Sequence, residues 1–401
     1  MTTKLNRTRN VTRRAIALIA LLVAVTVAST RLRAEIESGG TCGGASVNIP
    51  FNDVASNNIF FCAIASAYVS GLTNGTSLTT YGPVDPVSRE QMAAFITRTL
   101  NQSLKRGSRR AALKQWHIPQ SNYQQKKTQV GLQPTFVACD GEDLWVGNND
   151  SATISRVRAS DGKLLQTWTD AIDVQGVCVA GGRIYATGGV NRRLYIIDPT
   201  QPAGPVTTSI AELGGNAAGV TTDGLSIWTA NDGSVSRVSS DGLVVQSFST
   251  GFSNLQGILY DGANIWVTDN TQHTLKKLDG SGNIIQSVAT GLQPFYPVFD
   301  GSNIWVPNAS SDSVTVVRAA TGQIIASLSG NGLNVPVSAA FDGERILVTN
   351  LTGNSVSLWR ATDLAPLGSY SFLPGSVPRD ACSDGVNFWV ALSGSNTLAR
   401  F

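Results

Sequence analysis

The chain has 401 residues, of which 42% are hydrophobic and only 14% are charged, and its formal net charge is +3. This length allows two or three domains, and so small a net charge gives no general electrostatic reason for the chain to bind nucleic acid. Low charge together with 40 glycines is typical of an exported β protein with many turns.

Residues 1–29 have the layout of a secretory signal peptide. A basic start precedes the uncharged apolar run 15–29, and Val27-Ala28-Ser29 offers small residues for cleavage. The run is shorter than the ~20 apolar residues that span a bilayer comfortably. We therefore expect no transmembrane segment in the mature chain and a secreted protein of the cell wall or outer cell envelope. An uncleaved N-terminal membrane anchor is the alternative, and Arg13-Arg14 leaves both Sec and twin-arginine export open.

Residues 47–103 have the periodicity of a small helical module. Phe60, Ile64, Tyr68 and Leu72 share one face of a predicted helix. A second helix is predicted after a loop, and the Ser88–Gln91 spacing indicates a capping box at its start. The apolar residues expected on one face of this second helix are Met92, Phe95, Ile96 and Leu100.

This module resembles a single S-layer homology domain. The matching residues are Phe51-Asn52-Asp53-Val54, residues 67–75, and residues 86–95 with Ser88-Arg89-Glu90-Gln91 at their centre. In that family the domain, usually in three copies, attaches exported proteins to an anionic cell-wall polymer. The resemblance implies that Arg89, with Asp53 and Ser88, contacts a cell-wall polysaccharide or peptidoglycan-linked polymer. A guanidinium beside the free N–H groups of a helix N-terminus suits such an anion.

Residues 104–125 are predicted to form a basic and polar linker. Five basic side chains lie among Gly, Ser and Ala, and a Gln- and Asn-rich stretch follows. Such a composition is typical of a solvated, extended segment. An anionic wall or membrane surface is the alternative environment for these charges.

The five cysteines of an exported chain cannot all pair within it. Cys42 and Cys62, near the start of the helical module, are candidates for a disulfide. Cys139, Cys178 and Cys382 fall in the first strands of three repeats, where we interpret them as small buried apolar residues. The sequence has no Cys-x-x-Cys pair or His-rich cluster, so no metal site is predicted.

Residues 126–401 repeat one phrase with a period near 40: Asp-Gly, two variable residues, an aliphatic residue and Trp, clearest at residues 300–305. Two copies are weaker, because Asp342-Gly343 leads to Leu347 and Ala180-Gly181 precedes Tyr185. The first residues of the seven copies, called start residues below, are at positions 140, 180, 223, 261, 300, 342 and 384. Each period holds four short apolar segments bounded by turn residues, which predicts propeller blades. The last copy supplies only three strands, so we expect residues 126–131 to add the fourth and close the ring.

The repeats resemble the YVTN family of seven-bladed β-propellers. The resemblance rests on Ile265-Trp266-Val267-Thr268-Asp269, on residues 346–357, and on Asp161-Gly162-Lys163-Leu164-Leu165. It implies a mainly β fold, a seven-bladed β-propeller behind a small N-terminal helical module. It does not imply an activity, because propellers host many functions. We interpret the Trp that five of the seven copies carry as a packing residue between neighbouring blades.

The sequence offers no catalytic constellation. Its two histidines, His117 and His273, lack a partner set. Streptogramin lyases are similar to this chain in blade period, but they use a His–Glu set with magnesium and a Trp-Phe-Thr-Glu repeat, where residues 266–269 here read Trp-Val-Thr-Asp. We therefore predict a binding scaffold with no catalytic residue, metal or cofactor. The alternative is an envelope lyase, lactonase or quinone-dependent dehydrogenase on the propeller.

Residues four and five before each start residue are expected to begin the innermost strands, at the mouth of the central channel. Their unusual members are candidate contacts for a ligand or a protein partner on the propeller face: Gln175, Gln256, Phe295, Tyr296, Arg379 and Asp380. The Asn or Asp eight residues after most start residues is interpreted as a turn residue.

Overall fold

The computed structural model describes residues 38–42, 45–96, 127–210, 213–239 and 245–401. The expected signal peptide (1–29), the end of the helical module and the expected linker (104–125) lie outside these residues. Within the described ranges, no helix is both long enough and apolar enough to cross a bilayer.

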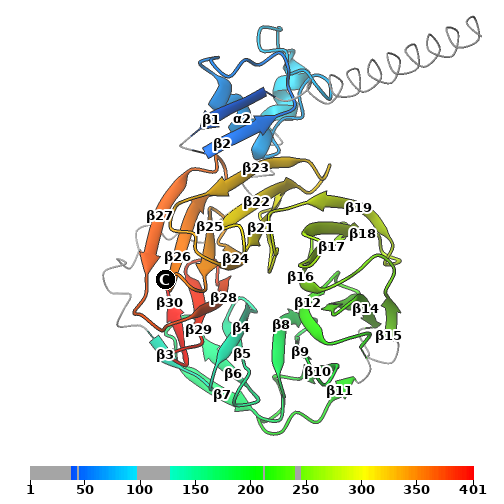
Figure 1. Cartoon of the computed structure of the whole chain (residues 1–401), viewed down its shortest axis with the longest axis vertical. Coiled ribbons are helices and arrows are strands. Elements are labelled where there is room, and N and C mark those ends of the chain that lie inside the picture. Colours follow the sequence, from blue (N-terminus) through cyan, green and yellow to red (C-terminus); the bar gives the residue numbers. More distant parts are fainter. Residues whose placement is uncertain (1–37, 43–44, 97–126, 211–212, 240–244) are drawn as a thin grey trace, which may run out of the picture.

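The described chain forms seven four-stranded antiparallel sheets arranged as the blades of a wheel, which confirms the predicted propeller (Figure 1). The blades are numbered here in chain order from the first complete one. From the innermost strand outward, blade 1 is β4 (Pro134–Cys139), β5 (Asp143–Asn148), β6 (Thr153–Arg158) and β7 (Leu164–Trp168). Blade 2 is β8 (Val174–Ala180), β9 (Arg183–Gly188), β10 (Arg193–Ile197) and β11 (Ser209–Ile210). Blade 3 is β12 (Ala217–Thr222), β13 (Ser226–Asn231), β14 (Ser234–Ser239) and β15 (Val245–Phe248).

The remaining blades follow the same order. Blade 4 is β16 (Leu255–Tyr260), β17 (Ile265–Asp269), β18 (Thr274–Leu278) and β19 (Ile284–Ala289). Blade 5 is β20 (Val298–Phe299), β21 (Asn303–Asn308), β22 (Ser313–Arg318) and β23 (Ile324–Ser329). Blade 6 is β24 (Pro336–Phe341), β25 (Arg345–Asn350), β26 (Ser355–Arg360) and β27 (Pro366–Ser371). Blade 7 is β28 (Pro378–Ser383), β29 (Phe388–Leu392), β30 (Thr397–Arg400) and β3 (Lys127–Gln129).

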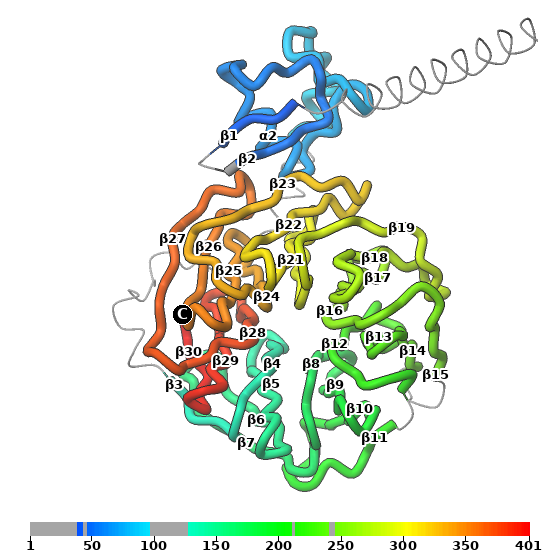
Figure 2. Tube along the Cα trace, viewed as in Figure 1, coloured from blue at the N-terminus to red at the C-terminus, as the bar shows by residue number. Residues whose placement is uncertain are grey.

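Blade 7 closes the ring with strands from both ends of the domain. β3 pairs antiparallel with β30, with Thr128 opposite Leu398, and Figure 2 shows the two strands side by side. The predicted closing strand is thus confirmed, and β3 takes the outer position that the last copy of the repeat leaves vacant. Closure removes the open sheet edge that a three-stranded last blade would present.

The repeated Asp and Trp form one structural unit. In blade 1, Asp140 accepts the backbone N–H groups of Glu142 and Asp143, and its second oxygen accepts the Trp145 indole N–H at 2.8 Å. The same indole bond recurs at Trp228, Trp266, Trp305 and Trp389. These five rings are at most 1% exposed, and Trp145 of blade 1 shares one apolar core with Val174 and Ile184 of blade 2. The predicted packing role between blades is confirmed.

The predicted turn role of the residue eight after the start residue is also confirmed. Asn148 donates to Thr153 and Ser155 across the turn between β5 and β6. Asn231, Asn308 and Asn350 do the same in their own blades. Blade 4 is different, because Asp269 there forms a buried ion pair of 3.3 Å with Lys276.

The N-terminal module contains the two helices and the loop that its sequence predicts, and it adds a hairpin that the sequence does not predict. An antiparallel hairpin of β1 (Ser38–Cys42) and β2 (Ala45–Ile49) precedes helix α2 (Phe61–Val69), and a second helical run covers residues 89–96. A disulfide joins Cys42 to Cys62, with 5.5 Å between their Cα atoms. The hairpin could not be predicted from the sequence, because β1 reads Ser-Gly-Gly-Thr-Cys and lacks the alternation of apolar residues that is typical of a strand.

The module's apolar faces also differ from the prediction. Ile64 and Tyr68 of α2 are buried as expected, but Phe60 precedes the helix and is 61% exposed. In the helical run 89–96, Met92 and Ile96 are 51% and 63% exposed. Two residues of the expected apolar face of this run are therefore largely exposed, whereas Phe95 is partly buried.

The module packs directly on the propeller at blades 5 and 6 (Figure 1). Its buried residues share one apolar core with Trp305 of β21 and Trp359 of β26. Two side chains of blade 5, Asn303 and Arg318, donate to the carbonyl oxygen of Val69 at the end of α2, at 2.9 and 3.1 Å. A cation at a helix C-terminus is favourable because the carbonyl groups there carry partial negative charge. The module is part of the folded body rather than a separate unit.

Candidate binding site at the channel mouth

The channel mouth is built on one backbone frame that all seven repeats share. In every blade, the carbonyl oxygen of the residue seven before the start residue accepts the N–H of the residue nine after it, at 2.8 to 3.1 Å. In blades 2 and 3, for example, these pairs are Asp173 with Gly189 and Asn216 with Asp232. Because the frame is constant, the side chains at these positions set the local chemistry of each sector of the mouth.

A bulge at the start of the innermost strands turns further side chains toward the channel. The pairing register shifts between Val174 and Gly176 in blade 2, and between Leu255 and Ile258 in blade 4. A bulged residue is released from the ladder and its side chain is re-aimed. Gln175 and Gln256 lie in these two bulges.

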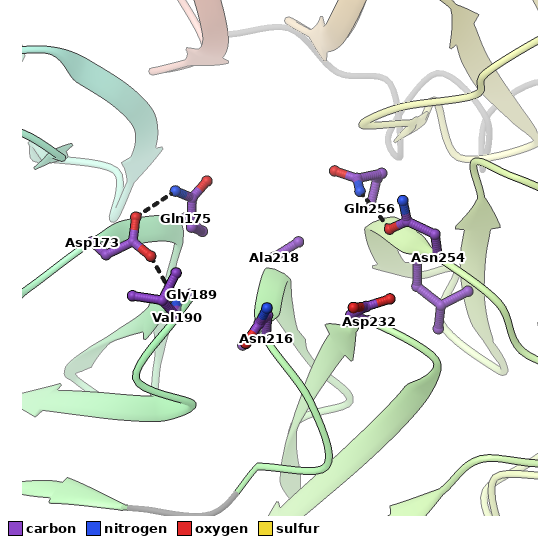
Figure 3. A pocket seen from close by; sticks show the side chains of 11 residues that line it. Asp173, Gln175, Gly189, Val190, Asn216, Ala218, Asp232, Asn254 and Gln256 are labelled. Atoms are coloured by element: carbon purple, nitrogen blue, oxygen red, sulfur yellow. Dashed lines mark hydrogen bonds between the residues drawn. The ribbon is translucent and has the colours of Figure 1, made fainter.

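A polar pocket of about 270 Å³ opens between blades 2 and 4 (Figure 3). Gln175 and Gln256 stand on its two sides, with the small Ala218 of blade 3 between them. The lining residues are Asp173, Gln175, Gly189 and Val190 of blade 2, Asn216, Ala217, Ala218 and Asp232 of blade 3, and Asn254, Leu255 and Gln256 of blade 4.

Hydrogen bonds orient the two glutamines. The Gln175 Nε2 donates to Asp173 at 2.7 Å, and the second oxygen of Asp173 accepts the Val190 N–H at 2.7 Å. Since a carboxylate only accepts, the Gln175 amide must direct its nitrogen to Asp173 and its oxygen elsewhere. The Gln256 Nε2 likewise donates to the Asn254 side-chain oxygen at 2.9 Å. Both amide oxygens are left to face the pocket (Figure 3).

The other four candidates of the channel mouth do not line this pocket. Phe295 and Tyr296 belong to blade 5, and Arg379 and Asp380 to blade 7. Arg379 is exposed at the rim, and the Thr349 hydroxyl donates to its carbonyl oxygen at 2.8 Å, which ties blade 6 to blade 7. The structure therefore separates the six candidates into a polar pair and a second group elsewhere in the channel wall.

Tyr296 extends across the channel to blade 1. Its ring meets Phe136 edge-on at 4.9 Å between centroids, although blades 1 and 5 are not neighbours in the ring. Continuing the β20–β21 register would place Tyr296 opposite Pro307, which has no N–H to donate. Tyr296 instead exchanges backbone hydrogen bonds with Val337 and Ala339 of blade 6. The innermost strand of blade 5 is therefore only the two residues Val298–Phe299.

Asp380 links three blades inside the channel wall. Its carboxylate accepts the Ser338 hydroxyl of blade 6 at 2.5 Å and the Val137 N–H of blade 1 at 3.0 Å. Burial raises the pKa of this carboxyl to about 6, and the two hydrogen bonds oppose that shift. Burial, and then the nearby Asp380, raise the pKa of Tyr296 well above its usual value. These groups hold the ring together at its closure.

Four polar pocket residues were not among the sequence-based candidates: Asp173, Asn216, Asp232 and Asn254. The first, second and fourth lie seven residues before a start residue, and Asp232 lies nine after one. Aligning the copies at these two offsets would have shown a polar sector in blades 2 to 4. The same offsets hold Val335, Leu351 and Val377 in blades 6 and 7, so the mouth also has a smaller apolar sector.

The candidate wall-binding residues lie in the N-terminal module. Arg89 is exposed in the first turn of the helical run 89–96. Ser88 and Gln91 form the predicted capping box, with bonds of 2.8 and 3.1 Å. Both oxygens of Asp53 accept backbone N–H groups of Tyr81 and Gly82. Ser88 and Asp53 thus support the loop and helix start from which Arg89 projects.

Neither a metal centre nor a reactive thiol is apparent in the described ranges. No three His, Cys, Asp or Glu side chains there are grouped so that they could hold a metal ion. Cys139, Cys178 and Cys382 are free thiols that pack against apolar clusters. Burial raises the pKa of Cys139 to about 11 and that of Cys178 to about 12, so these thiols stay protonated at neutral pH.

The sequence matches no protein-family model, and no curated protein matches it. Solved structures do resemble the fold. Virginiamycin B lyase from Staphylococcus aureus is 16% identical with a TM-score of 0.58, covering 69% of this chain and 98% of that one. A streptogramin B lyase is 15% identical with a TM-score of 0.57 over 68% and 96%. The hydrazine synthase of Kuenenia stuttgartiensis is 16% identical with a TM-score of 0.59 over 68% and 96%. At such identities the likeness shows the seven-bladed propeller fold alone.

Proposed function

We propose that the protein is an exported binding protein of the cell envelope. Its N-terminal module attaches to an anionic cell-wall polymer, and its propeller binds a second envelope component at the channel mouth. The observation that supports binding is the pocket of about 270 Å³, lined by amides and carboxylates that converge from three blades. Convergent polar groups in a concavity are typical of ligand sites.

Attachment to the wall is proposed for Arg89. Its guanidinium is exposed beside the start of a helix, where free backbone N–H groups add to the attraction for an anion. Because charge-assisted hydrogen bonds are strong, we expect Arg89→Ala to weaken co-sedimentation of the purified protein with purified wall polymer roughly tenfold.

Arg183→Ala is the matched control, because Arg183 is an exposed arginine at the start of β9, on the propeller. Its removal should leave co-sedimentation unchanged. Equal binding by wild type and Arg89→Ala would remove Arg89 from the proposed role.

A second candidate function is an envelope enzyme, and the two lyases with the same fold are the reason to test it. Metal analysis and an absorption spectrum of the purified chain decide between the two. A stoichiometric metal or quinone would favour the enzyme over the binding protein.

A further inference from the structure

The polar pocket carries negative charge that nothing in its lining offsets. It contains the carboxylates of Asp173 and Asp232 and no Lys, Arg or His. Asp173 is occupied by Gln175, Val190 and Asn149. Asp232 is exposed, and no hydrogen bond or ion pair from the described residues reaches its carboxylate. A ligand bearing positive charge would be drawn to this side chain.

Free oxygens outnumber free amide nitrogens in the pocket, where Asn216 and Asn254 supply the nitrogens. The nitrogens of Gln175 and Gln256 are engaged by Asp173 and Asn254, so each glutamine presents its oxygen. Together with Asp232, these oxygens form an acceptor-rich surface across blades 2 to 4 (Figure 3). A complementary ligand must bring several N–H donors, and a lysine ammonium brings three and an arginine guanidinium five.

The size and remaining lining fit an organic cation. A volume of about 270 Å³ is several times the roughly 30 Å³ that a water occupies in the liquid. Val190, Ala217 and Leu255 supply apolar surface along which a methylene stem can pack. A bare Ca²⁺ would need about six to eight converging oxygens, whereas this lining has two carboxylates on different blades. No aromatic ring lines the pocket, so a sugar ring would have no face to stack on.

An apolar sector of the same mouth indicates what carries the cation. Val335, Leu351 and Val377 of blades 6 and 7 occupy the offsets that hold Asn216, Asp232 and Asn254 in blades 3 and 4, and all three are partly exposed. A protein surface can cover such residues while one of its basic side chains enters the polar pocket. A neutral glycan would leave both the charge and this apolar sector unmatched.

We infer that the pocket between blades 2 and 4 receives a lysine or arginine side chain of an exported protein partner. Asp232 pairs with the charged group, and Gln175 and Gln256 accept its remaining N–H groups. The inference rests on the proposed function of the channel mouth and supplies the chemical class of its ligand.

The test uses two capped tripeptides, acetyl-Ala-Lys-Ala-amide and its norleucine counterpart, titrated into the mature protein and followed by NMR. Norleucine matches most of the lysine side chain but has no charge. We expect the lysine peptide to bind roughly tenfold more tightly, because a hydrogen-bonded charge contributes about 1.5–3 kcal/mol, and to weaken as salt rises.

Two variants locate the binding. Asp232→Asn should weaken lysine-peptide binding roughly tenfold, whereas Glu142→Gln, which removes an exposed carboxylate in the turn between β4 and β5, should not. Ala218→Gln should abolish binding by filling the pocket with the residue that both neighbouring blades already carry at this position.

Three outcomes would overturn the inference: equal binding of both peptides, wild-type affinity in Asp232→Asn, or displacement of the lysine peptide by chitotriose. A failure of the pocket inference can be told apart from a failure of the proposed wall attachment, because the Arg89→Ala variant should bind the lysine peptide with wild-type affinity. If Asp232→Asn lost binding to the wall polymer, the pocket would not be a site separate from the one proposed at Arg89, which would contradict the inference.

Discussion

At the scale of single residues, blade 4 differs from the other blades at two positions that contact each other. Asn148, Asn308 and Asn350 each donate to a Ser or Thr fifteen residues after the start residue. In blade 4 the same two positions are Asp269 and Lys276, which are 0% and 3% exposed. Lys276 also donates to the carbonyl oxygen of Gly251 at 2.8 Å. A buried ion pair here replaces a neutral hydrogen-bonded pair.

We expect Asp269→Asn alone to lower the free energy of unfolding by about 3–5 kcal/mol, because it leaves the Lys276 charge buried without a counter-charge. The double variant Asp269→Asn with Lys276→Ser rebuilds the arrangement of the sibling blades and should return close to wild-type stability. Urea unfolding of the single and double variants forms the thermodynamic cycle. Additive losses would show that the two residues are not coupled.

At the scale of the element, β3 is a three-residue strand that closes the whole ring. Val130 donates its N–H to Asn396 at 3.1 Å. Hydrogen-bonded pairs alternate along an antiparallel ladder, so Thr128 is in the same phase and its N–H faces β30. Lys127 is out of phase, and its N–H faces away from the sheet.

Proline substitutions should therefore behave differently at adjacent positions. Thr128→Pro removes a ladder hydrogen bond and should lower the free energy of unfolding by about 1–3 kcal/mol, with association of the opened β30 edge. Lys127→Pro should be far milder, because proline is tolerated where an edge N–H faces solvent. Thermal melts with light scattering measure both effects, and equal losses would contradict the assigned phase.

At the scale of the whole molecule, one blade is modified to receive the module. In blades 1, 3, 4 and 7 the Trp faces a cation on the third strand, as Arg156 lies 5.3 Å from the Trp145 ring. In blade 5 the residue opposite Trp305 is Val316, which is buried in the core shared with the module. Arg318 of the same strand stacks on Tyr68 at 4.4 Å. An apolar residue replaces the cation at the blade that the module covers.

The shared core predicts that module and propeller unfold together. Tyr68→Ala removes a ring that is 5% exposed and should cost about 3–5 kcal/mol by leaving a cavity. We expect calorimetry to show one transition for the wild type and an earlier, separate transition for this variant. Phe60→Ala, at a ring that is 61% exposed, should leave the single transition in place. Two transitions in the wild type would mean that the module is independent.

The sequence by itself determined the ring. The Asp-Gly and Trp of the repeat specify the turn and the packing residue within a few residues of each other. The contact between Asp300 and Trp305 can therefore be predicted from their spacing. The missing fourth strand of the last copy likewise required a partner, and residues 127–129 supplied it. The polar pocket could be predicted in part, because Gln175 and Gln256 both lie five residues before a start residue. Asp173 and Asp232 lie at two other offsets, seven before and nine after a start residue.

Only the tertiary structure decided which side chains meet across the ring. Tyr296 reaches Phe136, and Arg318 meets the end of α2, over sequence separations that no periodic pattern encodes. Such contacts depend on the angle at which the ring closes and on where the module packs. Local spacing determines which face of a strand a residue occupies, but the distance between two faces depends on the packing of the complete fold.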